Sequence, residues 1–69
     1  KGSNMFHVSA GKFDGYERNC KYCDSFESLD KAIVAYIDYS DYPWCELVYQ
    51  GKDNTYWIMN PYQQPVNIR

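Results

Sequence analysis

The fold of this chain is decided by residues 44–59, which read WCELVYQGKDNTYWIM. Two runs of strand-forming residues flank the turn-forming stretch GKDN and predict a β-hairpin. A four-residue loop sets Leu47 opposite Ile58 on one face and Val48 opposite Trp57 on the other. Both faces of the predicted hairpin therefore carry large apolar side chains, although a small antiparallel sheet normally buries only one face.

A hairpin is also expected near the N-terminus, because the residues from Phe6 to Lys12 alternate in the same way. Phe13, Asp14 and Gly15 suit a three-residue loop in which glycine takes the left-handed position. This loop would pair Val8 with Cys20 and would keep the apolar sides of the two strands in agreement.

Between the hairpins, a helix is predicted from about Leu29 to Tyr39, with Ser28 as its N-cap and Pro43 beyond its end. Its apolar stripe is expected to exclude Ala35 and to consist of Leu29, Ala32, Ile33, Tyr36 and Ile37. The resulting element order predicts an α+β fold: a small antiparallel sheet (β-β-α-β-β) with one helix packed on one face.

Length and composition limit the remaining possibilities. Among the 69 residues, 1–4 are interpreted as a cloning remnant, 5–60 as a single α+β domain and 61–69 as a C-terminal tail. The net charge of −2 and the absence of a basic stripe argue against nucleic-acid binding. No apolar run approaches the ~20 residues of a membrane span, so we expect no membrane insertion. Three cysteines are an odd number, which favours a cytoplasmic protein over a disulfide framework.

The first candidate binding surface is the second face of the predicted sheet, because one helix can cover only the other face. If they are exposed there, Trp44, Val48, Trp57 and Met59 form a patch large enough to bind a partner or a second copy of the chain. The alternative is that the tail folds back over this patch through Tyr62, Val66 and Ile68.

The second candidate is the segment between helix and hairpin, in which aromatic residues alternate with acids. Tyr39, Asp41, Tyr42 and Trp44 could meet a basic patch on a partner, because binding residues often lie in loops. The alternative is that the rings cap the core while the acids face water.

The cysteines suggest two alternative functions. Cys20 and Cys23, with His7 and Cys45, have the composition of a zinc site. However, Cys45 follows a helix of about 16 Å in length, and an extended Cys-x-x-Cys points its sulfurs to opposite faces. The same pair resembles the Cys-Pro-Tyr-Cys motif of glutaredoxins, with Lys21 in place of the proline. That resemblance implies a dithiol redox protein, but no helix begins directly at the motif.

No residue set indicates another kind of catalytic site, so the chain is expected to be non-enzymatic and without a cofactor. We expect a small protein-binding module, either self-associating as a homodimer or docking on a host macromolecule through an aromatic and acidic surface. In size and surface chemistry it resembles the accessory proteins with which phages and prophages inhibit or redirect host enzymes. That resemblance involves no sequence motif.

Overall fold

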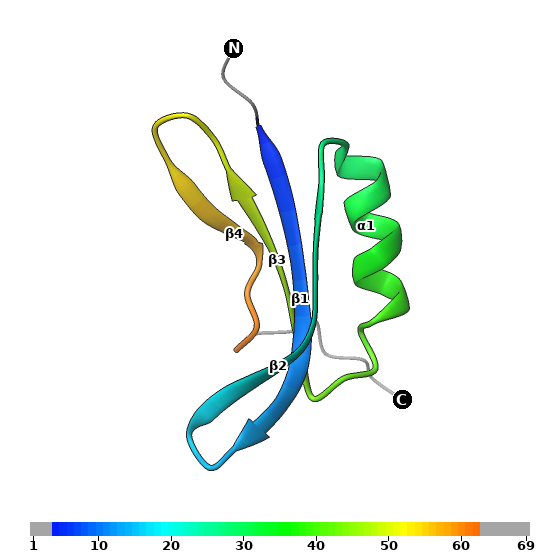
Figure 1. The fold of residues 1–69 in the computed structure, drawn as a ribbon, viewed down its shortest axis with the longest axis vertical. Helices are drawn as coiled ribbons and strands as arrows, with labels where there is room; N and C mark the ends of the chain where they lie inside the picture. Colours follow the sequence, from blue (N-terminus) through cyan, green and yellow to red (C-terminus); the bar gives the residue numbers. More distant parts are fainter. Residues whose placement is uncertain (1–3, 63–69) are drawn as a thin grey trace.

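The structure, a computed structural model, describes residues 4–62. It contains one four-stranded antiparallel sheet with strand order β2-β1-β3-β4, and one helix that covers a single face of this sheet (Figure 1). The predicted α+β fold is therefore confirmed. The elements are β1 (Met5–Asp14), β2 (Glu17–Phe26), α1 (Leu29–Asp38), β3 (Trp44–Gln50) and β4 (Thr55–Met59).

Helix α1 lies where it was predicted, but a different side of it faces the sheet. Ser28 occupies the N-cap position with extended backbone, and its carbonyl accepts a hydrogen bond from the Ala32 N–H, although its side chain makes no capping bond. The buried helix residues are Ala32, Ala35 and Tyr36. The prediction that Ala35 lies off the buried stripe is wrong, because small side chains let the helix approach the sheet closely.

The core lies between α1 and the central strands β1 and β3. Its buried members are Val8, Ala10, Ala32, Ala35, Tyr36, Cys45 and Leu47. The strand residues of this set lie on one face of the sheet because side chains alternate along a strand. Partly buried aromatic rings close the edges of the core, as expected for a domain that is too small for a large apolar interior.

The second hairpin, formed by β3 and β4, has the predicted strands and loop, but its register contains an irregularity. Val48 pairs with Trp57 as expected, whereas Leu47 pairs with Met59 and not with Ile58. Ile58 is thus an extra residue in β4 and forms a β-bulge, which changes the face on which the following side chains lie. Met59 therefore packs against the core, and its predicted place on the second face is wrong.

The first hairpin differs more from the prediction. Asp14 pairs with Glu17, so Gly15 and Tyr16 form a two-residue turn, with φ of 68° at Gly15. Positive φ at the first turn residue alone defines a type II′ turn, whose twist suits a hairpin. The three-residue loop was wrong because apolar alternation alone could not reveal an interruption in the pairing.

That interruption is a bulge in β2 at Lys21. Ala10 pairs with Tyr22, and the next residue, Gly11, pairs with Cys20. The β2 backbone passes so close to Gly11 that an added Cβ would lie 1.8 Å from the Asn19 carbonyl oxygen. Only glycine fits at this position, which explains a glycine inside a strand.

Candidate functional site

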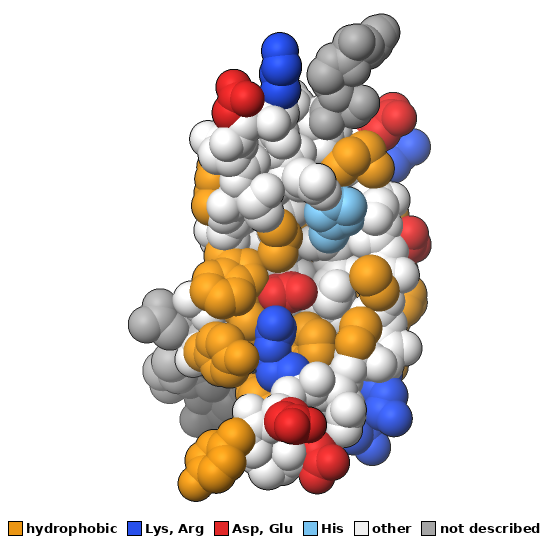
Figure 2. All heavy atoms as spheres, turned by 60° about the vertical axis from the view of Figure 1, so that its left-hand side comes forward, with side chains coloured by type: hydrophobic (Ala, Val, Ile, Leu, Met, Phe, Trp, Pro, Cys, Tyr) orange, Lys and Arg blue, Asp and Glu red, His pale blue; other side chains and the backbone are white. Residues whose placement is uncertain are grey.

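The face of the sheet that points away from α1 is the candidate functional surface and is called the open face below. Alternation along the paired strands places its members, which include residues of all four strands. Figure 2 shows hydrophobic side chains gathered there around a basic and an acidic side chain. The described strand residues of the open face are Met5, His7, Ser9, Gly11, Phe13, Arg18, Cys20, Cys23, Ser25, Trp44, Glu46, Val48, Gln50, Thr55 and Trp57.

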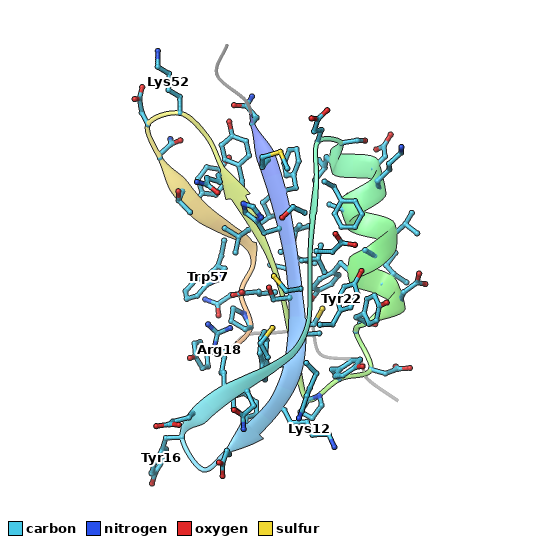
Figure 3. The ribbon with its side chains drawn as sticks, viewed as in Figure 1. Lys12, Tyr16, Arg18, Tyr22, Lys52 and Trp57 are labelled. Atoms are coloured by element: carbon cyan, nitrogen blue, oxygen red, sulfur yellow. The ribbon has the colours of Figure 1, made fainter. Side chains whose placement is uncertain are left out.

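The bulge in β2 determines which residues reach this face. If Lys21 paired regularly and β2 had no bulge, Arg18 and Cys20 would share the face of Tyr22 and point toward the helix. With the bulge they share the face of Cys23. In Figure 3, Arg18 lies on the side of the sheet opposite α1, while Tyr22 lies between the sheet and the helix.

Glu46 organises the centre of the open face. Its Oε1 accepts hydrogen bonds from Arg18 Nη1 at 3.1 Å and from Trp57 Nε1 at 2.8 Å. The Arg18 and Glu46 side chains are 26% and 15% exposed, so their ion pair is partly shielded from water. One carboxylate thus fixes both a cation and an indole ring, each from a different strand.

Trp44 lies beneath this cluster. Its predicted exposure on this face is wrong, because the residue is buried. The residue is 2% exposed, and its Nε1 donates a hydrogen bond to the Lys12 carbonyl at 2.9 Å. The Arg18 guanidinium stacks 4.5 Å from the Trp44 ring centroid and 5.4 Å from that of Tyr62. Trp44 therefore supports the site from below, because the cation lies between it and solvent.

Trp57 is the large apolar side chain that remains open at the centre of this face. It is 45% exposed, and the edge of the Tyr62 ring packs against it with centroids 6.2 Å apart. With Val48, Thr55 and Tyr56 it lines a groove of about 360 Å³. The alternative, in which the tail folds over this surface, holds in part: Tyr62 contacts Trp57 and Arg18, whereas Val66 and Ile68 lie outside the described residues.

A shallow hollow of about 500 Å³ extends from this cluster toward the β1–β2 turn. It is lined by Ser9, Tyr16, Glu17, Arg18, Cys20, Trp44, Glu46 and Tyr62. Sequence reasoning missed Arg18 and Glu46, because their meeting depends on the bulge. The signal that could have revealed it was Gly11 inside an alternating strand.

The tip of the first hairpin is a further feature that was not predicted. β3 pairs with β1 only as far as Gly11, so the hairpin continues beyond it, and Tyr16 is fully exposed at its tip. In Figure 3, Tyr16 projects from the end of this hairpin. Asp14 and Glu17 face each other across its last rung, an arrangement that like charges disfavour.

Two aromatic residues of the loop between α1 and β3, Tyr39 and Tyr42, pack against the core. Tyr39 stacks on Tyr22 with ring centroids 3.6 Å apart, and Tyr42 packs against Tyr39 at 5.9 Å. The hydrogen bond with Tyr39, together with burial and Asp24, raises the pKa of Tyr22 far above its ordinary range. Asp41 is exposed. Tyr39 and Tyr42 thus lie together and cover the edge of the core.

The metal and redox alternatives gain no geometric support. The described residues 4–62 contain no group of three or more His, Cys, Asp or Glu side chains placed to hold a metal ion. His7 pairs with Ser25, four rungs from Gly11 and Cys20, and its ring nitrogens contact Ser25 Oγ at 2.7 Å and Gln50 Oε1 at 2.6 Å.

Cys20 and Cys23 are both exposed, and Cys45 is buried. Both exposed cysteines lie on the open face with the bulge between them, and the structure has no disulfide between them. Helix α1 begins six residues after Cys23, so the helix N-terminus on which the glutaredoxin-like motif depends does not lie at the pair.

Comparison with known families, curated proteins and solved structures finds no match for this chain. Within the part of the chain that the structure describes, no helix has the length and apolar character needed to cross a membrane.

Proposed function

We propose that this chain is a non-enzymatic protein-binding module that docks on a partner protein through its open face. The observation that carries this proposal is the state of Trp57. The residue is 45% exposed, yet a hydrogen bond to Glu46 and an edge contact with Tyr62 hold its ring in place. Tryptophan is among the commonest interface hot spots, and a side chain that is already ordered loses little entropy on binding.

The groove beside Trp57 supports the same reading. Val48 and Thr55 belong to its lining, and Val48 pairs directly with Trp57 across the hairpin. An apolar side chain of a partner can fill this groove while the Arg18–Glu46 pair supplies a polar rim. Apolar centres with polar margins are the usual anatomy of a protein interface.

The tip of the first hairpin lies beside the open face and adds an acidic margin to it, where Glu17 lines the hollow next to Arg18. Asp14 and Glu17 stand opposite each other beside the exposed Tyr16 ring, and basic groups on a partner would relieve their repulsion. The partner surface is thus proposed to carry Lys or Arg residues next to the apolar side chain that fills the groove. We also propose a cytoplasmic location, where the exposed thiols of Cys20 and Cys23 would stay reduced.

The test is affinity capture with the immobilised chain, from a lysate of the cells that naturally express it, quantified by mass spectrometry. We expect one partner at stoichiometric yield. Trp57→Ala should weaken its capture at least about tenfold, since losing a hot spot costs about 2 kcal/mol or more. Ile58→Ala is the matched control: it is the adjacent residue, 39% exposed, and lies outside the groove. Capture that survives Trp57→Ala, or no stoichiometric partner, would overturn the proposal.

A second variant separates binding from folding. Asp14→Asn combined with Glu17→Gln removes the repulsion at the hairpin tip, so it should stabilise the free protein by a few tenths of a kcal/mol. The same change should weaken capture and reduce its salt dependence. A variant that is more stable and binds as tightly as the wild type would exclude the tip from the interface.

A further inference from the structure

The outward side of α1 is apolar to a degree that the core does not explain. Ile33, Val34 and Ile37 are 40%, 60% and 62% exposed, and Leu29 at the first turn is 39% exposed. The helix turns its alanines toward the sheet, so its larger aliphatic side chains face solvent. In Figure 1 the sheet covers only one side of α1.

These four side chains form one surface, called the α1 patch below. Leu29, Ile33 and Ile37 follow each other at intervals of four residues, and Val34 lies beside the last two. Their exposed area is on the order of 350 Å², the size of the largest apolar patch on a typical monomer, and such patches often mark interaction sites.

Charges beside the α1 patch indicate what covers it. Lys31 and Asp38 are seven residues apart, almost two full helical turns, so they lie on the same flank of α1. Both are exposed, and the single ion pair recorded within residues 4–62 joins Arg18 and Glu46. One flank thus presents a cation near one end of the patch and an anion near the other.

Such a flank is complementary to itself when two helices run in opposite directions. A two-fold axis near residues 34 and 35 would set Lys31 of each copy beside Asp38 of the other. It would also bring the two α1 patches together. Self-complementarity of this kind is the requirement of an isologous interface.

We propose that the α1 patch is a self-association surface, in which two copies of the chain pack their α1 helices antiparallel and form two reciprocal Lys31–Asp38 ion pairs. The sheet separates this surface from the open face, so the dimer carries two open faces directed outward. A partner with repeated binding sites would then be held with added avidity. This inference does not rest on the proposed function.

The patch is smaller than the ~800 Å² per partner of a standard interface, so the dimer is weak and its formation depends on concentration. Sedimentation equilibrium from about 5 to about 500 µM spans the corresponding dissociation constants. The expected result is a monomer–dimer equilibrium within this range. A monomer throughout would overturn the proposal.

Variants test the surface and its geometry. Ile37→Glu removes exposed apolar area without touching the core and should abolish the dimer, whereas Trp57→Ala should leave it unchanged. A dimer that is lost in Trp57→Ala and kept in Ile37→Glu would place the interface on the open face and overturn the proposal.

The charge pattern is tested by reversal. Lys31→Asp and Asp38→Lys should each weaken the dimer about threefold or more, because each places like charges together. Lys31→Asp places an acid in the first turn of α1, and Asp38→Lys places a base in the last turn. Both charges interact favourably with the helix dipole, so the variants should fold. The double variant restores opposite charges and should dimerise to within about twofold of the wild type. Failure of this rescue would exclude the antiparallel arrangement.

Discussion

Replacing Gly11 with alanine tests whether the bulge in β2 builds the open face. The new Cβ would lie 1.8 Å from the Asn19 carbonyl oxygen and 2.9 Å from the Lys21 nitrogen. An ordinary C···O contact is about 3.3 Å or longer, so β2 must move by roughly 1.5 Å, about a third of the spacing between strands. Such a shift breaks two or three ladder hydrogen bonds and should cost about 3–5 kcal/mol.

That cost is comparable with the whole stability of a domain of this size, about 3–9 kcal/mol. Urea unfolding followed by tryptophan fluorescence should therefore show Gly11→Ala to be largely unfolded, or refolded without the bulge. In the refolded case Arg18 would turn toward the helix, and the environment of the tryptophans would change even in the absence of urea.

Gly51→Ala is the matched control. Its Cβ would meet the end of the Tyr49 side chain at 2.7 Å, and that ring can move. We expect a loss of no more than about 1 kcal/mol. Gly15→Ala should fall between the two at about 1–3 kcal/mol, because it forces a positive φ on a residue with a Cβ. A loss below about 1 kcal/mol for Gly11→Ala would refute the reasoning about the bulge.

Three further predictions concern the cysteines and the carboxylate of the open face. Cys20 and Cys23 are exposed and Cys45 is buried, so a thiol reagent should modify two thiols in the native protein and the third only after unfolding. Burial, with a contribution from Glu46, raises the pKa of Cys45 from 9.0 to about 11. The folded state therefore keeps a proton that the unfolded chain loses, so urea midpoints should fall as the pH rises from 9 to 11, and fall less in Cys45→Ala. Glu46→Ala removes the oxygen shared by two donors and should cost about 1–2 kcal/mol, with altered tryptophan fluorescence; an unchanged spectrum would argue against the hydrogen bond from Trp57 to Glu46.

Local pattern was sufficient for the second half of the fold. The bounds of β3 and β4 are the predicted ones, because alternation and a loop of turn-forming residues are properties of neighbouring residues. The helix was also found from its spacing and from Pro43. The side of the helix that is buried was not predicted correctly, because Ile33 and Ile37 are more apolar than Ala35 and were expected to face the core.

The candidate site was only partly predictable for the same reason. Trp57 and Val48 were placed on the second face correctly, from the register of their hairpin. Trp44 and Met59 were also assigned to that exposed surface, yet one is covered by Arg18 and the other is turned toward the core. Each error follows from an interaction between residues that are far apart in sequence.

The sequence by itself determined the order of strands and helix, since hydrophobic period and turn chemistry act over a few residues. Which side chains share a face of the sheet, and which side of the helix is buried, was decided only by the tertiary structure. Two bulges, each a single extra residue in one strand, change which side chains share a surface, and they arise from how whole strands pair. The pairing of Arg18 with Glu46 across the sheet, and the outward turn of the aliphatic side of α1, are consequences of that packing.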